Sequence, residues 1–507
     1  MRKILAIMCC AVMLLSVLAS CAKDTETPDN GSENNGSQDV ADTGDTKPDM
    51  RPIEYDDKGF VKDYIPDDLD YNQREIKIVG WNGDKGEMDF ETDFSSGKGI
   101  EIPKATYDRN NMVEKRLNVK LNIDYTIIGN NANREKYIAS VKNNMLTEKY
   151  DIIACYSQCA ANFAVDGTTV DLMQYSNIFN FDRPWWSETL AQESMVNNKL
   201  YFASGAISTT NILQTACIAV NLDMLDTLQL DDPRELVNNR EWTMEAFYKM
   251  CKGVYKNAND KDPNKDSGDE FGFTTIDNIV LDGFFASNGF RYYESDDEGR
   301  LIISPDLESV GIETLITELN TKFNTNDYYI SGGTGIFNSG RALMVGTTFH
   351  HLIYNMRSHI EFNYGYVPYP AAEAGQTNYT VTGFPFTMWC MTSENDNDAE
   401  GAEAIAYVME CLASESYRKV QPAVYDLIKY KNNDDPVNVK MFEIILESKI
   451  YDLGRIFINV SDWDDCAVGL FRRAVTGSLN KNWMGAIEEK KQPLQSAIDT
   501  INQQFGY

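Results

Sequence analysis

Three histidines and ten cysteines are the residues of this 507-residue chain that could most readily bind a metal ion or react. His350 and His351 are adjacent and diverge on any regular element, and His359 lies in no pattern such as HExxH. We therefore expect neither catalysis nor metal binding from them. The seven cysteines after Cys21 have scattered spacings that form no disulfide framework and no zinc set. We expect most of them to be buried apolar side chains.

An acidic run at 257–273 spaces its side-chain oxygens in the manner of a calcium loop. These oxygens belong to Asp260, Asp262, Asn264 and Asp266. The calcium-loop pattern also needs glycine at its sixth position and glutamate at its twelfth, and neither possible register supplies them. A solvated acidic turn is therefore favoured, with a calcium site as the alternative.

Several signatures of enzymes are missing from the sequence. The chain contains no GxSxG, no phosphate-binding GxxxxGK[ST] and no dinucleotide-binding GxGxxG. No cofactor is expected. With 77 acidic residues, the chain could still hold the pair of carboxyl groups that a glycoside hydrolase needs, about 5–10 Å apart, although no pattern indicates such a pair.

Aromatic and polar side chains beside predicted strands are the candidates for ligand contact, because open α/β sheets bind ligands at the carboxyl ends of their strands. Aromatic rings also offer rigid apolar planes with a polar edge. The candidates are Trp81, Tyr156, Ser157, Gln158, Trp185, Trp186 and Trp389. For each of them, packing in the core is the alternative. Since side chains alternate along an extended stretch, we expect one member of the 185–186 pair to be buried in the core.

The elements that position these residues begin with strand, helix, strand, helix, strand at 74–81, 107–119, 119–128, 134–149 and 150–156. This order predicts a parallel sheet with right-handed crossovers. Further helices are predicted at 241–258, 305–323, 399–430, 437–449, 464–475 and 482–504. Further strands are predicted at 198–205, 215–225, 342–346, 364–367 and 383–391.

Length and charge limit the class of protein. The globular part of roughly 435 residues exceeds the usual size of one core, so two lobes are expected. The segment from 340 to 391 is expected to return to the first lobe, and such crossings create a hinge beside a cleft. A net charge of −31 argues against nucleic acid as a partner.

The N-terminus combines Arg2 and Lys3 with an apolar run at 4–18, which is too short to span a bilayer comfortably. Leu18-Ala19-Ser20-Cys21 resembles the lipobox of bacterial lipoproteins, which implies that Cys21 is lipidated and becomes the first mature residue. An ordinary secretory signal is the alternative. Residues 22–50 lack aromatic side chains and are rich in Asp, Asn, Gly, Ser and Thr, which predicts a disordered tether.

Several segments in order resemble a known family from about residue 72 to 480. They are Gly80-Trp81, the block at 150–175, "RPWW" at 183–186, "LVNNREWTMEAFYK" at 236–249, "GRALMVG" leading into "YGYVPYP", and "IYDLG" at 450–454. Together they are similar to family 1 extracellular solute-binding proteins, the receptors of ATP-binding-cassette (ABC) importers, and above all to members from anaerobic Gram-positive bacteria.

This resemblance implies an α/β, two-lobe periplasmic-binding-protein-like fold of type II, with parallel-core sheets, an interlobe cleft and a hinge. It also implies a monomeric receptor on the outer face of the cell membrane that binds a sugar or oligosaccharide, performs no chemistry and delivers its solute to separate ABC permease subunits. Peptides or another solute are the alternative ligands, and a surface glycoside hydrolase is the rival function.

The expected organisation is a signal peptide at 1–20 and an acidic, lipid-anchored tether at 21–71. The N-terminal lobe is expected to comprise 72–205 with 337–395, and the C-terminal lobe 206–336 with 396–507.

Overall fold

The first sheet of the computed structural model has the strand order β12-β3-β1-β2. Its strands are β1 (Arg74–Val79), β2 (Val119–Asp124), β3 (Ile152–Tyr156) and β12 (Thr387–Met391). Strand β1 pairs in parallel with β2 and β3, whereas β12 pairs antiparallel to β3. Every residue of β3 is buried, as the apolar sequence of a central strand predicts. The predicted order of the first five elements is confirmed.

The structure describes residues 52–507 apart from 84, 96–99, 131, 260, 263, 267, 331, 377–378, 380, 384–385, 394–397, 432–434, 459 and 461–465. The predicted signal peptide, Cys21 and most of the predicted tether lie outside the described residues. Residues 52–507 form one compact unit. No helix within its described part is long and apolar enough to cross a membrane.

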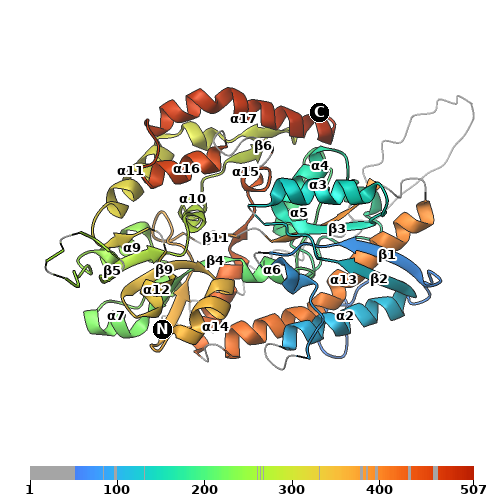
Figure 1. Ribbon diagram of the computed structural model, residues 1–507, viewed down its shortest axis with the longest axis horizontal. Helices are drawn as coiled ribbons and strands as arrows, with labels where there is room; N and C mark the ends of the chain where they lie inside the picture. The colour runs from blue at the N-terminus through green and yellow to red at the C-terminus, as the bar shows by residue number, and fades with distance from the viewer. Residues whose placement is uncertain are drawn as a thin grey trace, which may run out of the picture. The chain divides into compact units, whose positions relative to one another are not determined.

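The second sheet has the order β10-β4-β9-β5-β8. Its strands are β4 (Ala216–Asn221), β5 (Phe271–Thr275), β8 (Tyr328–Tyr329), β9 (Ala342–Thr348) and β10 (Tyr364–Val367). Strand β9 is buried throughout and pairs in parallel with β5 and antiparallel with β4. Figure 1 shows β4, β5 and β9 grouped apart from β1, β2 and β3.

The range 337–395, expected to lie with the first lobe, is divided between the two sheets. Strands β9 and β10 belong to the second sheet and β12 belongs to the first. The reason is hydrogen bonding: β9 fills the position between β4 and β5, so the chain returns to the first sheet only at β12. The predicted strand at 198–205 is also absent; this segment forms isolated bridges, such as Ala203 with Trp389.

Helices flank both sheets. They are α2 (Glu101–Leu117), α3 (Arg134–Met145), α4 (Ser157–Val165), α9 (Met244–Cys251), α10 (Asp282–Ser287), α11 (Val310–Phe323), α13 (Ala399–Asp426), α14 (Pro436–Glu447), α15 (Leu453–Ile456), α16 (Ala467–Val475) and α17 (Trp483–Phe505). Helix α13 runs beside α2 (Figure 1), and Arg109 of α2 donates to Ser416 of α13 at 3.3 Å. Part of the range expected in the C-terminal lobe therefore packs on the first sheet's helices.

The segments that connect the sheets are bonded to one another. Residues 204–215, which include α6 (Thr209–Leu213), lead from the first sheet toward β4, and 368–386 lead from β10 back to β12. Within the second connection, β11 (Val381–Thr382) pairs in parallel with β13 (Lys449–Ile450). Lys449 Nζ donates at 2.6 Å to both the backbone and the side-chain oxygen of Asn211. These contacts join the connecting segments at one place.

The described cysteines are buried and free of disulfides, which confirms their interpretation as core side chains. They are Cys155, Cys159, Cys217, Cys251, Cys390, Cys411 and Cys466.

Candidate functional site

Trp81 and Tyr156 lie at the carboxyl ends of β1 and β3, Trp389 lies in the middle of β12 opposite Ala154, and all three are buried. The indole of Trp81 donates to Thr387 Oγ1 at 2.8 Å, and its ring lies 5.2 Å from that of Tyr156. The indole of Trp389 donates to Ser208 Oγ at 3.0 Å. The polar edges of both indoles are thus bound within the protein. Ligand contact by these three residues stays a prediction.

A buried carboxylate ties the same region to the first connecting segment. Asp89 accepts from the backbone N–H of Thr210 at 3.0 Å, from the Thr210 hydroxyl at 2.6 Å and from the Thr387 hydroxyl. Burial raises the pKa of Asp89 to about 6, against the opposing effect of these hydrogen bonds. Helix α6 is thereby anchored to the first sheet.

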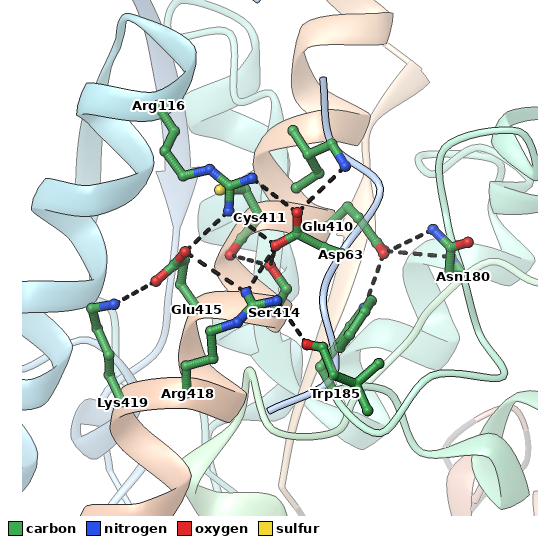
Figure 2. Close-up of polar contacts among 12 residues, drawn as sticks. Asp63, Arg116, Asn180, Trp185, Glu410, Cys411, Ser414, Glu415, Arg418 and Lys419 are labelled. Carbon is green, nitrogen blue, oxygen red and sulfur yellow. Dashed lines mark hydrogen bonds and ion pairs between the residues drawn. The ribbon is translucent and has the colours of Figure 1, made fainter. Parts of the chain in front are cut away.

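Trp185 lies elsewhere, against α13 (Figure 2), and Trp186 contacts the same residue of that helix. The expectation that Trp185 and Trp186 face opposite ways is wrong, because both indoles donate to one carboxylate, that of Glu410, at 2.9 and 2.7 Å. The chain turns at this point, with the Trp186 N–H bonded to the Arg183 carbonyl, so the alternation of an extended strand does not apply. Both rings are buried. Their contact with a ligand stays a prediction.

Ser157 and Gln158 begin α4 directly after β3, and both are buried. The backbone N–H of Ser157 donates to the Phe386 carbonyl at 2.9 Å. The side-chain oxygen of Gln158 accepts from Arg134 Nη1 at 3.1 Å, where Arg134 is the first residue of α3. Gln158, one of the predicted ligand-contact residues, is therefore hydrogen-bonded to Arg134, which lines a cavity.

That cavity has a volume of about 420 Å³, within the range typical of small-molecule sites. One side is Arg134, from the first sheet's helix α3; the other side comes from the segment after β5 and from the end of α16. Its described lining consists of Arg134, Asp277, Asn278, Gly469, Arg472, Arg473, Thr476 and Ser478. The lining is polar and combines a helix beside the first sheet with a segment that follows a strand of the second sheet.

A buried ion cluster supports the wall of the cavity. Asp282, whose side chain is fully buried, accepts from Arg472 Nε at 2.8 Å and from Arg455 Nε at 2.9 Å. Arg455 also donates to the carbonyl of Gly383 in the second connecting segment. The orientation of Arg472 is therefore set by a carboxylate that is itself bound to α15.

A π-helix, His351–Met356, follows β9 beside this wall. Asp277, a lining residue, raises the pKa of His351, but burial outweighs it and lowers that pKa overall. Burial, with smaller effects of His351 and Lys85, lowers the pKa of His350 to about 3. Burial thus lowers the pKa of both histidines.

In the described part of the chain, no group of three or more His, Cys, Asp or Glu residues is placed to hold a metal ion. In the acidic run, the Asp262 carboxylate accepts from the backbone and side-chain nitrogens of Asn264, at 3.0 and 2.9 Å. Asp260 lies outside the described residues.

A second cavity, of about 480 Å³, lies near the start of α13 and includes Thr169, Asp171, Tyr175 and Tyr201. Asp171 already accepts from the backbone N–H groups of Met173 and Leu200. The Asp171 carboxylate is therefore occupied by backbone groups of its own region. We take the cavity lined by Arg134, Arg472 and Arg473 as the better candidate for a ligand site.

The sequence analysis did not identify the arginines that line the 420 Å³ cavity. Arg472 and Arg473 fall in the last turn of α16, where basic residues are ordinary because they complement the helix dipole. Arg134 begins a helix that carried no motif. No local pattern marks any of the three, since the cavity exists only where distant segments meet.

No family model and no curated protein sequence matches this chain. Its fold is similar to that of solved structures. A sugar transporter from Rhizobium etli in an open conformation has 12% identity and a TM-score of 0.53, covering 85% of this chain and 98% of its own. UgpB from Mycobacterium tuberculosis in complex with glycerophosphocholine has 11% identity and a TM-score of 0.51, covering 78% and 95%.

The maltose-maltodextrin binding protein of Alicyclobacillus acidocaldarius has 13% identity and a TM-score of 0.50, covering 83% of this chain and 100% of its own. At identities this low, the structural likeness establishes a shared fold and nothing more. The predicted fold class, α/β with two lobes in the manner of periplasmic binding proteins, is thereby confirmed.

Proposed function

We propose that this chain is the solute receptor of an ABC importer, held outside the cell by lipid on Cys21, and that it binds a sugar or oligosaccharide without altering it. The observation that carries the proposal is the cavity lined on one side by α3, which lies between β2 and β3 of the first sheet in sequence, and on the other by α16 and by the segment that follows β5 of the second sheet. The fold it shares with a sugar transporter and a maltodextrin-binding protein supports the same conclusion.

The mechanism we propose is hinge closure. A solute that touches Arg134 on one side and α16 on the other binds best when both sides are close, so it shifts the population toward the closed form. The connecting segments at 204–215 and 368–386 would carry the rotation. The two sheets would be the cores of the two lobes, with separate permease subunits recognising the closed form.

A thermal-shift screen of mono- and oligosaccharides against peptides tests the ligand class. We expect at least one saccharide to raise the melting temperature in a concentration-dependent way, because a ligand that binds only the native state stabilises it. Stabilisation by peptides alone would overturn the sugar assignment. Small-angle scattering with the stabilising saccharide tests closure, which predicts a smaller radius of gyration.

The rival function, glycoside hydrolysis, needs two carboxyl groups at the site. The described lining of the cavity contains one carboxylate, that of Asp277. We therefore expect no turnover of chromogenic glycosides. Turnover that is lost in Asp277→Asn, with the melting temperature unchanged, would replace the receptor by an enzyme.

The lipid anchor has its own test. In cells fed a palmitate analogue, the full chain should carry the label at the membrane, and Cys21→Ser should abolish the label and the membrane fraction. Cys155→Ser is the matched control, because Cys155 is a buried core thiol that cannot be reached.

A further inference from the structure

We propose that His350 and His351, together called the histidine pair, contact the solute and hydrogen-bond its hydroxyl groups. The inference rests on the proposed function, because it assigns further contacts to the same solute. Its starting observation concerns two ring nitrogens. Nε2 of His350 and Nδ1 of His351 are buried, and neither has a hydrogen-bond partner in the part of the chain that the structure describes. Native proteins leave few such atoms unpaired, so each needs a partner from outside the chain, either a water molecule or a ligand.

The position of the histidine pair in the second sheet favours a ligand. The pair follows β9, which runs parallel to β5, so the carboxyl ends of both strands lie at one edge of the sheet. Open α/β sheets bind ligands beyond the carboxyl ends of their strands. Thr275, the last residue of β5, has a buried hydroxyl that is likewise unpaired among the described residues. Unpaired polar atoms therefore lie at the edge where this type of fold places a ligand.

Both imidazole rings are held in place by the protein. His350 is 4% exposed, and its ring stacks on that of Tyr354 with 5.2 Å between the centroids. The His351 ring meets the His350 ring edge-on at 5.6 Å, and the His351 backbone N–H donates to Thr348 Oγ1 at 3.2 Å. The π-helix His351–Met356 begins here, and π-helical turns are frequent at functional sites. The rings are thus oriented before a solute arrives, which lowers the entropy cost of binding.

The histidine pair lies near residues that follow strands of both sheets. Burial lowers the pKa of His351, and Asp277, which lines the cavity of about 420 Å³, opposes this effect, so these two residues are close. Burial also lowers the pKa of His350, with His351 and then Lys85 adding to the effect. Lys85 follows β1 of the first sheet. The pair is therefore placed where a solute between two lobes can contact it.

Hydroxyl groups fit the unpaired ring nitrogens. A neutral imidazole carries one N–H donor and one acceptor nitrogen. His350, with a pKa lowered to about 3 mainly by burial, is uncharged at pH 7. Because a hydroxyl group both donates and accepts, it pairs with a ring nitrogen in either tautomer. In the proposed mechanism the solute reaches these nitrogens in the open form, and closure then buries the new hydrogen bonds.

Isothermal titration of the full chain, purified in detergent, tests the histidine pair. The probes are maltotriose, cellotriose, xylotriose and mannotriose. His350→Phe keeps a ring stacked on Tyr354 but removes the nitrogen, so the saccharide that the parent chain binds should bind at least about tenfold more weakly. His351→Phe should act in the same direction. His359→Phe is the matched control, because His359 is exposed, and it should leave the affinity unchanged.

Stability separates a ligand contact from a structural role. Replacing a buried, unpaired nitrogen by an apolar ring removes its desolvation cost, so the melting temperature of ligand-free His350→Phe should equal or exceed that of the parent chain. A residue needed only for packing gives the opposite result, a lower melting temperature with unchanged affinity. That result overturns the proposal.

NMR gives an independent readout, because the chain contains three histidines. In histidine-labelled protein each ring contributes its own Cε1–H signal, and the variants assign these signals. Adding the bound saccharide should move the signals of His350 and His351 and leave that of His359 in place. This measurement decides the question if a variant fails to fold.

The outcomes are distinguishable. Unchanged affinity in both His350→Phe and His351→Phe, or unmoved signals of both rings, overturns the histidine pair and leaves the sugar receptor standing. Weaker binding in either variant, with a shift of that ring's signal, supports the pair. If none of the saccharides binds, the sugar receptor and the histidine pair are overturned together.

Discussion

Glu410 shows how one residue can organise a core. Its carboxylate accepts from the indoles of Trp185 and Trp186 and from the side chain of Asn180, and Figure 2 shows the contacts of Trp185 and Asn180. Burial nevertheless raises its pKa to about 7, against the effect of these bonds. Because the folded pKa exceeds the unfolded value of about 4.3, Glu410 contributes most stability at acidic pH. That contribution is lost as pH rises through about 7.

Replacing Glu410 tests this account. Glu410→Gln should lower the free energy of unfolding by about 1–3 kcal/mol, because its amide NH2 faces an N–H donor and leaves it unpaired. The loss of stability that Glu410 causes between about pH 4.5 and 7 should also disappear. Denaturant unfolding at several pH values measures both effects, with Glu400→Gln, exposed on the same helix, as control. An unchanged pH slope would contradict the assignment.

Among the elements, the segment before β1 is held by a polar cluster on α2 and α13 (Figure 2). Asp63 accepts from both Arg116 and Arg418, at 2.9 and 2.8 Å, and from Ser414. Burial tends to raise the pKa of Asp63, but the hydrogen bonds and charges of the arginines lower it overall. Since the folded pKa lies below the unfolded one, the stabilisation is present above about pH 4 and is lost as pH falls further.

Removing this carboxylate takes from the partly buried Arg116 and Arg418 one of the two carboxylates that they share, and leaves them only Glu415, at 3.0 and 3.7 Å. Asp63→Asn should therefore lower the free energy of unfolding by about 3 kcal/mol. Limited proteolysis should also cut the segment at 52–71 faster. Asp67→Asn, exposed in the same segment, is the control and should change neither measurement. Equal proteolysis of the two variants would show that the cluster does not hold the segment.

Lys449, which binds the first connecting segment through Asn211, makes stability depend on pH. Burial lowers its pKa to about 7, below the unfolded value of about 10.4. The folded state therefore binds fewer protons between these values, and the contribution of Lys449 to stability rises with pH across this window. Below about pH 7 the buried cation imposes its full cost.

Lys449→Met should remove the rise in stability with pH that Lys449 causes. Denaturant unfolding at pH 7 and 9 should show a smaller gain in stability for this variant than for the parent chain. Lys252→Met, at an exposed position, should retain the gain. If Lys449→Met gains as much stability as the parent, Lys449 is protonated in the folded protein throughout.

For the whole molecule, net charge is the dominant electrostatic feature. A charge of −31 on one chain favours expansion through self-repulsion, and salt screens this repulsion. We expect the free energy of unfolding to rise between about 10 mM and about 0.3 M NaCl. Chemical unfolding in the two buffers measures it, with a non-ionic osmolyte as control. A fall in stability would mean that the ion pairs outweigh the repulsion.

Local patterns in the sequence were sufficient for many elements. The alternating run at β1, the apolar run at β3 and the amphipathic helix α16 were predicted because periodicity reports how a segment is buried. The buried cysteines and the position of Trp81 after a strand followed from the same local signals.

Only the tertiary structure decided which sheet β9 joins, that Trp185 and Trp186 share Glu410, and that Arg134 meets Arg472 and Arg473 at one cavity. A buried strand has the same apolar sequence pattern in either sheet. The sheet that it joins depends on hydrogen bonds to strands far away in the chain, which no local pattern reports. A cavity has no pattern of its own, since its walls are brought together by the packing of segments that share no sequence neighbourhood.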